Sequence, residues 1–375
     1  MPSAELLSEA QRLMTICNAC RYCEGYCAVF PAMELRTKFD AEDTVYLANL
    51  CHNCRGCYYA CQYAPPHEFG VNVPQTLSAL RLDSYRDFAW PHVLAGLFRR
   101  NGLALGLISL ASLGLIVALV LGWQDASVVF SSHTGPGAFY EVIPYRLMVV
   151  PALVLSGLIV LALGIGLARF WRAIGGRWRE LADLPALARG GWDALRLTYL
   201  GGGGHGCNYP DAGFSQHRKW LHHLTFYGFG LDLLATSTAA VYHHVFAWEA
   251  PYPYTSLPVV LGTVGGLGLL VGPAGLLWLK WRSDPLPAAE SVWGMDVGFL
   301  VLLFLTSLSG LVLLAARETA AMGSLLVIHL GFVAGLFITF PYGKFVHAVY
   351  RYAALVRYAQ EGKEHPDSLP GTGAA

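Results

Sequence analysis

Residues 51–61 read CHNCRGCYYAC, and residues 17–27 read CNACRYCEGYC. Both stretches have the spacing C-x2-C-x2-C-x3-C, which is the ligand spacing of a [4Fe–4S] cluster. The first three thiolates of such a run wrap one iron–sulfur cube, and the fourth usually binds the neighbouring cube. Two copies of the run therefore predict two [4Fe–4S] clusters whose ligands are crossed between the runs.

The crossed rule assigns four cysteines to each cluster. The first set is Cys17, Cys20, Cys23 and Cys61, and the second set is Cys27, Cys51, Cys54 and Cys57. The alternative is structural zinc, but zinc sites are typical of two separated C-x2-C pairs and not of four thiols within eleven residues.

Two details qualify the cysteine pattern. The bacterial ferredoxin run ends in Cys-Pro, whereas Ala28 follows Cys27 and Gln62 follows Cys61, so the local turn is expected to differ while the ligand count does not. The ninth thiol, Cys207, stands alone and is interpreted as a packing residue, because free cysteine behaves as a small hydrophobe.

The chain around these motifs has two parts of different composition. Of its 375 residues, 55% are hydrophobic and only 13% are charged, which is too apolar for an ordinary soluble enzyme. Residues 1–100 are polar and carry eight of the nine cysteines, and we expect them to form a ferredoxin-like head. No signal peptide precedes Cys17, so the head is expected in a reducing cytoplasm, where clustered cysteines bind metal rather than form disulfides.

Beyond the head, apolar runs recur that approach or exceed the ~20 residues needed to cross a bilayer as a helix. Six spans are predicted, at residues 103–123, 147–168, 222–247, 256–279, 294–315 and 324–347. The predicted fold class is therefore mainly α, with a two-cluster head followed by a six-helix transmembrane bundle of the cytochrome b type. The predicted domains are the head at 1–100, the bundle at 101–350 with a cytoplasmic loop at 169–220, and a cytoplasmic tail at 351–375.

The distribution of basic residues predicts the orientation. The loops after the first, third and fifth spans contain only Arg146 and Arg317, so the other 23 of the 25 lysines and arginines lie on the side of the termini. Because basic loops remain in the cytoplasm, the head and both termini are expected on the cytoplasmic side of a bacterial inner membrane.

Histidines in the predicted spans suggest haem, because ionisable residues inside a membrane are expensive and usually functional. His329 and His347 are eighteen residues apart, about five turns of helix, and would share one face at ~27 Å separation. Along the third span, His222 shares a face approximately with His243 or His244. No Cys-x-x-Cys-His is present, so covalent c-type haem is not expected.

The topology predicts how these histidines pair. The third and sixth spans run in opposite directions, so His222 and His347 form an inner pair on the head side, and His243 and His329 form an outer pair. Each pair is a candidate set of axial ligands for one b-type haem. A kink at Pro341 would shorten the distance between His329 and His347, and with it the distance between the two haems. The adjacent histidines, His223 and His244, are alternates that otherwise cap helix ends.

Two further polar residues lie in or near the spans. Lys344 is expected at the inner membrane surface, where it either contacts a haem propionate or a quinone or snorkels to the interface. Asp232 lies eleven residues before His243, where it either relays protons to a quinone or bonds to neighbours such as Thr236.

Three stretches resemble a known family. Residues 46–74 (YLANLCHNCRGCYYACQYAPPHEFGVNVP), the YHH at 242–244 and the FPYGKFVH at 340–347 are similar to the tricarballylate utilisation protein TcuB family, also called CitB, and the resemblance covers essentially the whole chain. It implies an iron–sulfur and haem b protein that reoxidises the reduced FAD of the tricarballylate dehydrogenase TcuA. The partner oxidises tricarballylate to cis-aconitate, and the electrons pass to the quinone pool. The eight cysteines match the family's cluster motifs, but Asp232 is not assigned by them.

The expected function is electron transfer from the reduced FAD of a TcuA-like partner through two [4Fe–4S] clusters and one or two b-type haems to quinone. No GxGxxG follows a predicted strand, so neither FAD nor NAD is expected to bind, and no organic substrate should react on this chain. The formal net charge of zero argues against nucleic-acid binding.

Two alternative functions would use the same features. A quinol-oxidising anchor of a reductase would carry electrons in the opposite direction, and redox potentials would distinguish it. A membrane redox sensor would report cluster oxidation without net flux, so it would show no steady-state quinone reduction with a flavoprotein. The sequence leaves open the number of haems, the quinone site, the oligomeric state and the organic substrate.

Overall fold

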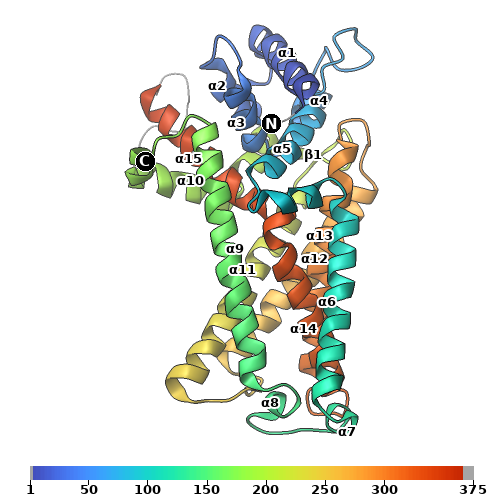
Figure 1. The fold of residues 1–375 in the computed structure, drawn as a ribbon. Helices are drawn as coiled ribbons and strands as arrows, with labels where there is room; N and C mark the ends of the chain where they lie inside the picture. Colours follow the sequence, from blue (N-terminus) through green and yellow to red (C-terminus); the bar gives the residue numbers. More distant parts are fainter. Residues whose placement is uncertain (1–2, 366–375) are drawn as a thin grey trace.

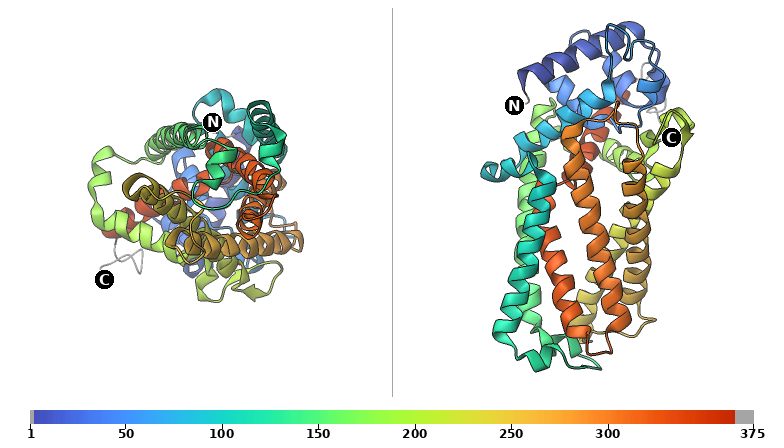
Figure 2. Two further views of the ribbon diagram at one scale, coloured as in Figure 1. Left: turned by 90° about the horizontal axis from the view of Figure 1, so that it is seen from below. Right: turned by 90° about the vertical axis from the view of Figure 1, so that its right-hand side faces the viewer.

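The computed structural model describes residues 3–365 of the chain. Short helices near the N-terminus form a head at one end of a bundle of long helices (Figure 1). The last helix, α15 (Val346–Glu364), leaves the bundle and also ends beside the head (Figure 2).

The head is built from five helices, α1 (Ala4–Cys20), α2 (Val29–Glu34), α3 (Ala41–Leu50), α4 (Gly56–Tyr59) and α5 (Val73–Phe88). Local signals fix where two of them begin. Asp40 and Asp43 form a capping box at the start of α3, and Asn72 caps α5, whose first turn contains Pro74. The apolar residues of the head share one core with parts of α9 (Tyr145–Ala173) and α15, so the head is packed onto the bundle and not merely tethered to it.

The bundle contains six helices that are long and apolar enough to cross a membrane, as predicted. They are α6 (Asn101–Trp123), α9, α11 (His217–Phe246), α12 (Leu257–Trp281), α13 (Trp293–Ala316) and α14 (Met322–Thr339), which leads into α15. The first five begin and end within five residues of the predicted positions. The mainly α fold class, with six candidate membrane spans behind an N-terminal head, is thus confirmed.

The sixth predicted span, residues 324–347, is not one continuous helix. α14 ends at Thr339, the short 3-10 helix η7 (Phe340–Tyr342) follows, and α15 begins only at Val346. The break occurs at Pro341, which has no backbone N–H to continue the helical hydrogen bonds. The inference that His329 and His347 share a face assumed an unbroken helix, and the break removes that basis.

Short elements connect the long helices. The end of the bundle away from the head carries α7 (Ala126–Val129) and α8 (Ala138–Val142). The predicted loop 169–220 contains α10 (Leu184–Arg196) and an antiparallel pair, β1 (Cys207–Asn208) and β2 (Phe214–Ser215). The other 3-10 helices are η1 (Glu24–Tyr26), η2 (His92–Phe98), η3 (Trp178–Ala182), η4 (Thr198–Leu200), η5 (Gly202–Gly204) and η6 (Glu290–Val292).

Small residues let α11 and α12 approach closely. A Cβ added at Gly265 would lie 2.8 Å from the backbone oxygen of Gly228, and a Cβ added at Gly228 would lie 2.8 Å from the oxygen of Gly265. Real Cβ atoms do not make contacts that short, so both positions require glycine. Gly228 of α11 and Gly265 of α12 therefore serve the packing of these two helices.

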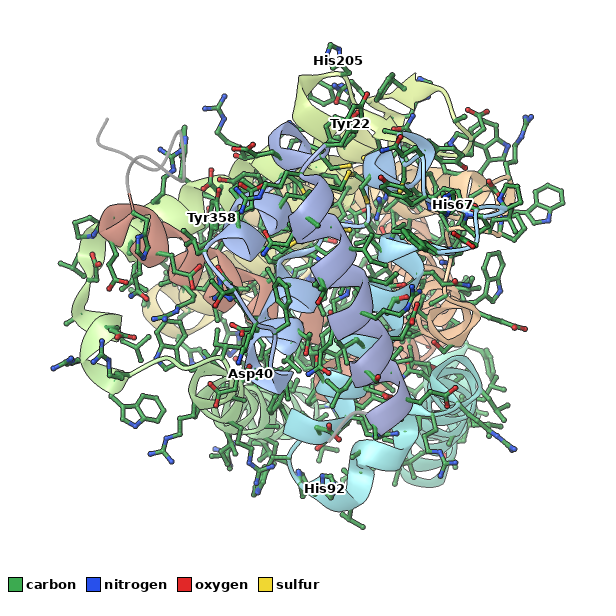
Figure 3. The ribbon with its side chains drawn as sticks, turned by 90° about the horizontal axis from the view of Figure 1, so that it is seen from above. Tyr22, Asp40, His67, His92, His205 and Tyr358 are labelled. Atoms are coloured by element: carbon green, nitrogen blue, oxygen red, sulfur yellow. The ribbon has the colours of Figure 1, made fainter. Side chains whose placement is uncertain are left out.

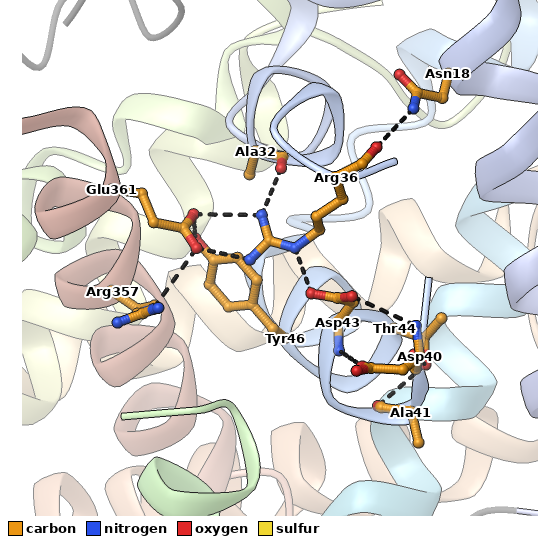
Figure 4. A network of polar contacts seen from close by, with 10 residues as sticks. All are labelled: Asn18, Ala32, Arg36, Asp40, Ala41, Asp43, Thr44, Tyr46, Arg357 and Glu361. Atoms are coloured by element: carbon orange, nitrogen blue, oxygen red, sulfur yellow. Dashed lines mark hydrogen bonds and ion pairs between the residues drawn. The ribbon is translucent and has the colours of Figure 1, made fainter. Parts of the chain in front are cut away.

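A polar network holds α15 against the head (Figure 4). The carboxylate of Glu361 accepts a hydrogen bond from Arg36 Nη2 at 2.6 Å and another from the Tyr46 hydroxyl at 3.0 Å. Arg36 also pairs with Asp43 at 2.5 Å, and Arg357 lies 3.6 Å from Glu361. The predicted tail 351–375 thus begins as a docked helix; residues 366–375 lie outside the described part of the chain.

Candidate functional site

The eight cysteines of the two motifs line two neighbouring cavities in the head. The first cavity, of about 240 Å³, is lined by the four cysteines of the first set together with Cys57. The second cavity is lined by the four cysteines of the second set. Its free space is about 10 Å³, close to one water molecule, so it is much smaller than the first cavity.

The thiols that raise the pKa of a given cysteine belong mainly to its own set. Burial, followed by the nearby thiols of Cys23, Cys61 and Cys20, raises the pKa of Cys17 to about 12. Burial also raises the pKa of Cys57 well above its ordinary value, and the nearest thiols that add to this effect belong mainly to the second set. The structure brings together the two sets that the crossed rule predicts, and the ligand assignment itself stays a prediction.

The two motifs share a backbone feature. Arg21 follows the second cysteine of the first run and Arg55 follows the second cysteine of the second run, and both have left-handed φ angles of 54° and 67°. At Arg21 this conformation is the left-handed C-cap of α1, where its N–H donates to the carbonyl oxygen of Cys17, and at Arg55 it precedes the first turn of α4. In the second run the turn also directs the backbone N–H of Asn53 to the sulfur of Cys51 at 3.4 Å, and hydrogen bonds to sulfur are one means by which iron–sulfur sites are tuned.

The spacing of the thiols suits a multi-iron cluster better than a single ion. A zinc ion requires thiolate sulfurs ~2.3 Å away in a closed tetrahedron. Within residues 3–365, no three His, Cys, Asp or Glu side chains converge closely enough to hold one metal ion. The cysteines of each set instead line a shared cavity, and the binding of an iron–sulfur cube there stays a prediction.

The first cavity opens to the surface of the head. Cys20 is exposed and Tyr22, which lines the cavity, is 69% exposed. Figure 3 looks onto this end of the molecule and labels Tyr22. Cys51 and Cys54 of the second set, by contrast, are buried, so the first set is the more exposed of the two.

The loop of the second set is hydrogen-bonded to α15, α11 and β1. Arg351 Nη2 of α15 donates to the carbonyl oxygen of Cys51 at 2.7 Å, and Arg218 Nη1 of α11 donates to that of Asn53 at 2.5 Å. The backbone N–H of Asn208 in β1 donates to the carbonyl oxygen of Cys54 at 3.0 Å. The segment between α9 and α11 therefore contributes to the contact between the head and the bundle.

The inner histidine pair is brought together. The ring centroids of His222 and His347 lie 6.1 Å apart and their planes are inclined at 83°. His347 Nδ1 lies 2.5 Å from the backbone oxygen of Lys344, which fixes that ring and leaves its Nε2 free. Two imidazoles that bind one metal ion through bonds of ~2 Å have ring centroids at about this separation. His222 and His347 are therefore the residues that would hold a haem iron here, and haem at this pair stays a prediction.

The outer pair has a different arrangement. His243 stacks on Tyr145 with ring centroids 3.8 Å apart. His329 lies against α13, where its Nδ1 is 3.1 Å from Ser309 Oγ, and a Cβ at Gly310 would approach the ring to 2.9 Å. Each histidine thus contacts residues other than its predicted partner, and a second haem at this pair stays a prediction.

The alternate histidines have their own neighbours. His223 lies between Trp220 and Tyr227, with ring centroids 5.9 and 5.7 Å away. His244 Nε2 is 2.8 Å from the hydroxyl of Tyr145. His222 is therefore the member of the adjacent pair at 222–223 that meets His347.

Lys344 forms an ion pair that the sequence did not indicate. Its Nζ lies 2.6 Å from one carboxylate oxygen of Asp296, and Lys280 Nζ lies 2.7 Å from the other. The presence of an acidic residue in a predicted span was the signal that could have identified Asp296. The three groups together retain one positive charge beside the inner pair.

Three other polar residues are placed as follows. The hydroxyl of Thr236 donates to the backbone oxygen of Asp232 and not to its carboxylate. The buried Cys207 donates to the backbone oxygen of Leu200 at 3.1 Å and packs in an apolar cluster with Cys54. Reasoning from sequence missed His52, which is 4% exposed and lines the second cavity with its Nε2 unpartnered.

Two family models match the chain. The citrate utilization protein B Fer4-like domain matches residues 10–87, and citrate utilization protein B matches residues 96–367. The Fer4-like match indicates iron–sulfur binding by the head. The citrate utilization protein B of Escherichia coli is 48% identical over 360 residues, which cover 94% of this chain and 92% of that protein. No solved structure matches the chain. The chain belongs to the citrate utilization protein B family.

Proposed function

We propose that this protein carries electrons from the reduced FAD of a partner dehydrogenase to quinone in the membrane. Membership of the citrate utilization protein B family and the Fer4-like head support an electron-transfer role in tricarballylate or citrate utilisation. In this proposal the partner is a TcuA-like flavoprotein, the head faces the cytoplasm, and the bundle lies in the bacterial inner membrane. The excess of basic residues on the head side supports that orientation.

The residues that would hold the carriers follow from the geometry. The two cysteine sets would each bind a [4Fe–4S] cluster, and His222 and His347 would bind one b-type haem. When bound, these groups supply one-electron carriers, which lets a two-electron flavin discharge in two steps. His243 and His329 are proposed for a second haem, and Lys344 for charge balance near a haem propionate or quinone.

One observation carries the proposal. Arg218 and His222 are four residues apart on α11, and Arg351 and His347 are four residues apart on α15, so each arginine lies one turn from an inner histidine on the same helix face. Both arginines donate to backbone oxygens of the loop that carries Cys51 and Cys54. A short covalent and hydrogen-bonded connection therefore joins the second cysteine set to the inner pair.

The experiment compares two histidine variants of the full chain. The pyridine haemochrome content and Soret absorbance of purified protein should fall in His347→Ala and stay at the wild-type level in His223→Ala. Proteoliposomes containing menaquinone should reduce it when photoreduced flavin mononucleotide is supplied outside, at a rate above that of protein-free liposomes. His347→Ala should abolish this excess rate. A wild-type protein without haem, or without any excess rate, would contradict the proposal.

A further inference from the structure

Three arginines from three helices surround the loop of the second cysteine set. Arg81 of α5 and Arg351 of α15 both donate to the carbonyl oxygen of Cys51, at 2.5 and 2.7 Å. Arg218 of α11 donates to the carbonyl oxygen of Asn53 at 2.5 Å. Arg81 is 6% exposed, and the other two are half-buried. We call these three residues the arginine collar.

The arginines of the collar differ from other cations at the junction in their acidic neighbours. In the part of the chain that the structure describes, none of its three guanidinium groups lies within 4.0 Å of a carboxylate. Elsewhere at the junction cations do have acidic partners, as Lys280 and Lys344 have in Asp296. Clustered cations without counterions are costly in a partly buried position, so the loop they surround is suited to carry negative charge.

The first cysteine set lacks such surroundings. Arg21, which follows Cys20, is 55% exposed in its side chain and lies 3.7 Å from Glu34. An exposed cation with its own carboxylate partner has little effect on a nearby charge, because solvent screens it. The two sets therefore differ in electrostatic environment although they share one cysteine motif.

We infer that the arginine collar raises the reduction potential at the second cysteine set above that at the first. This inference rests on the proposed function, since it requires a cluster at each set. Reduction adds one negative charge, and nearby cations in a medium of low dielectric constant favour the more negative state. The collar thereby favours electron residence on the membrane side of the head, and electrons that enter at the exposed first set move toward the inner histidines.

The test is potentiometric titration of the anaerobic full-length protein, followed by electron paramagnetic resonance. Arg351→Gln and Arg218→Gln should each shift the midpoint potential of one cluster to a lower value and leave the other unchanged. Arg351→Lys, which keeps the charge, should retain most of the wild-type potential, and Arg21→Gln is the control that should leave the second cluster unshifted.

Different results would overturn the tuning role of the collar and the proposed function. If both clusters assemble in Arg351→Gln and Arg218→Gln and neither potential moves, the collar has no tuning role. If Arg351→Gln does not assemble its second cluster, the midpoint potentials of Arg218→Gln and Arg351→Lys are the test. An unshifted potential in Arg218→Gln then shows that the collar has no tuning role. A wild-type protein with no cluster signal would overturn the proposed function instead.

A second inference comes from the surface of α10 and needs no cofactor. One face of α10 packs on α15, where a Cβ at Gly190 would lie 2.9 Å from Val356 Cγ2. The opposite face exposes large apolar side chains at helical spacing, with Leu184 71%, Trp192 55% and Leu195 42% exposed. The helix runs across the bundle axis near the head (Figures 1 and 2).

The depth of α10 relative to the spans is fixed by a hydrogen bond. The hydroxyl of Tyr227, ten residues into α11, donates to the backbone oxygen of Leu195 at 2.9 Å. Trp220 and Leu224 of α11 are exposed on the adjoining turns, so the apolar face of α10 adjoins exposed apolar side chains of a candidate span. Arg196 lies over the ring of Trp192 at 5.3 Å, and arginine beside tryptophan is typical of the membrane interface.

We propose that the apolar face of α10 lies in the headgroup region of the bilayer leaflet nearest the head. The lipid surface is the occupant that this position favours, because the stripe adjoins a span at interface depth. In this position α10 ties α15, and with it the head, to the membrane surface.

Photocrosslinking of the full chain in native lipid nanodiscs tests this placement. With p-benzoylphenylalanine in place of Trp192, mass spectrometry should detect phospholipid adducts, as it should at Leu153, which is 65% exposed on α9. The same probe in place of Tyr22 on the head should give none. Adducts at Leu153 without adducts at Trp192, or adducts at Trp192 to a protein only, would overturn the proposal.

Discussion

The Glu361→Gln substitution is predicted to loosen the head from α15. Glu361 is 5% exposed and accepts hydrogen bonds from Arg36 and Tyr46. The glutamine keeps the shape of the side chain but removes the negative charge opposite Arg36. Arg36 would retain its second partner, Asp43, at 2.5 Å.

The magnitude follows from the burial of this network. Removing one partner of a buried ion pair typically costs ~3–5 kcal/mol because the remaining charge is left uncompensated. Since Asp43 still compensates Arg36, the lower end applies, about 3 kcal/mol. At ~1.4 kcal/mol for each factor of ten, this corresponds to a loss of local protection of about 100-fold.

Hydrogen exchange followed by mass spectrometry measures this loss in the peptides that cover α2 and α3. Glu9→Gln is the matched control, because the exposed Arg12–Glu9 pair in α1 contributes less than about 1 kcal/mol. A double-mutant cycle of Arg36→Met with Glu361→Gln should give strongly non-additive effects. If the two effects simply add, or if Glu361→Gln leaves α3 as protected as the control does, the reasoning is refuted.

Three further predictions concern the bundle and its far end. Asp296→Asn leaves two lysines without a carboxylate and should lower the free energy of unfolding by about 3 kcal/mol or more. The loss is measured as a lower thermal midpoint in detergent, and Asp296→Glu should lower the free energy of unfolding less. The carbonyl of Val128 raises the pKa of His133. The loop between α6 and α9 should therefore be most protected from hydrogen exchange below pH ~6.5 and lose protection as pH rises through the raised pKa. His133→Gln should remove this pH dependence. Gly265→Leu would force side-chain atoms against Gly228 and should abolish stable expression, while leucine at the exposed Gly106 should not.

The spans and the cysteine motifs could be predicted because both are local signals. Hydrophobic length along the chain defines the six spans, and the spacing of thiols within eleven residues defines each motif. The break in the sixth span was also indicated locally, by Pro341. The pairing of His222 with His347 followed from counting spans, which fixes the end of the bundle at which each histidine lies.

The remaining features depend on contacts that no periodicity records. Arg36 and Glu361 are separated by 325 residues, and single charges that meet across such a distance leave no pattern in either segment. The same holds for the three arginines around the second cysteine set, which come from α5, α11 and α15. The packing of α10 on α15 was hidden because its amphipathic pattern does not specify which helix covers its buried face.

The most direct test of the central claim is to follow which cysteine belongs to which cluster. The anaerobically purified chain should contain about eight iron and eight sulfide in clusters, and electron paramagnetic resonance should resolve two signals. Cys61→Ser should remove the same signal as Cys17→Ser, and Cys27→Ser should remove the same signal as Cys51→Ser. Zinc without sulfide, or loss of signals that follows each run by itself, would contradict the account.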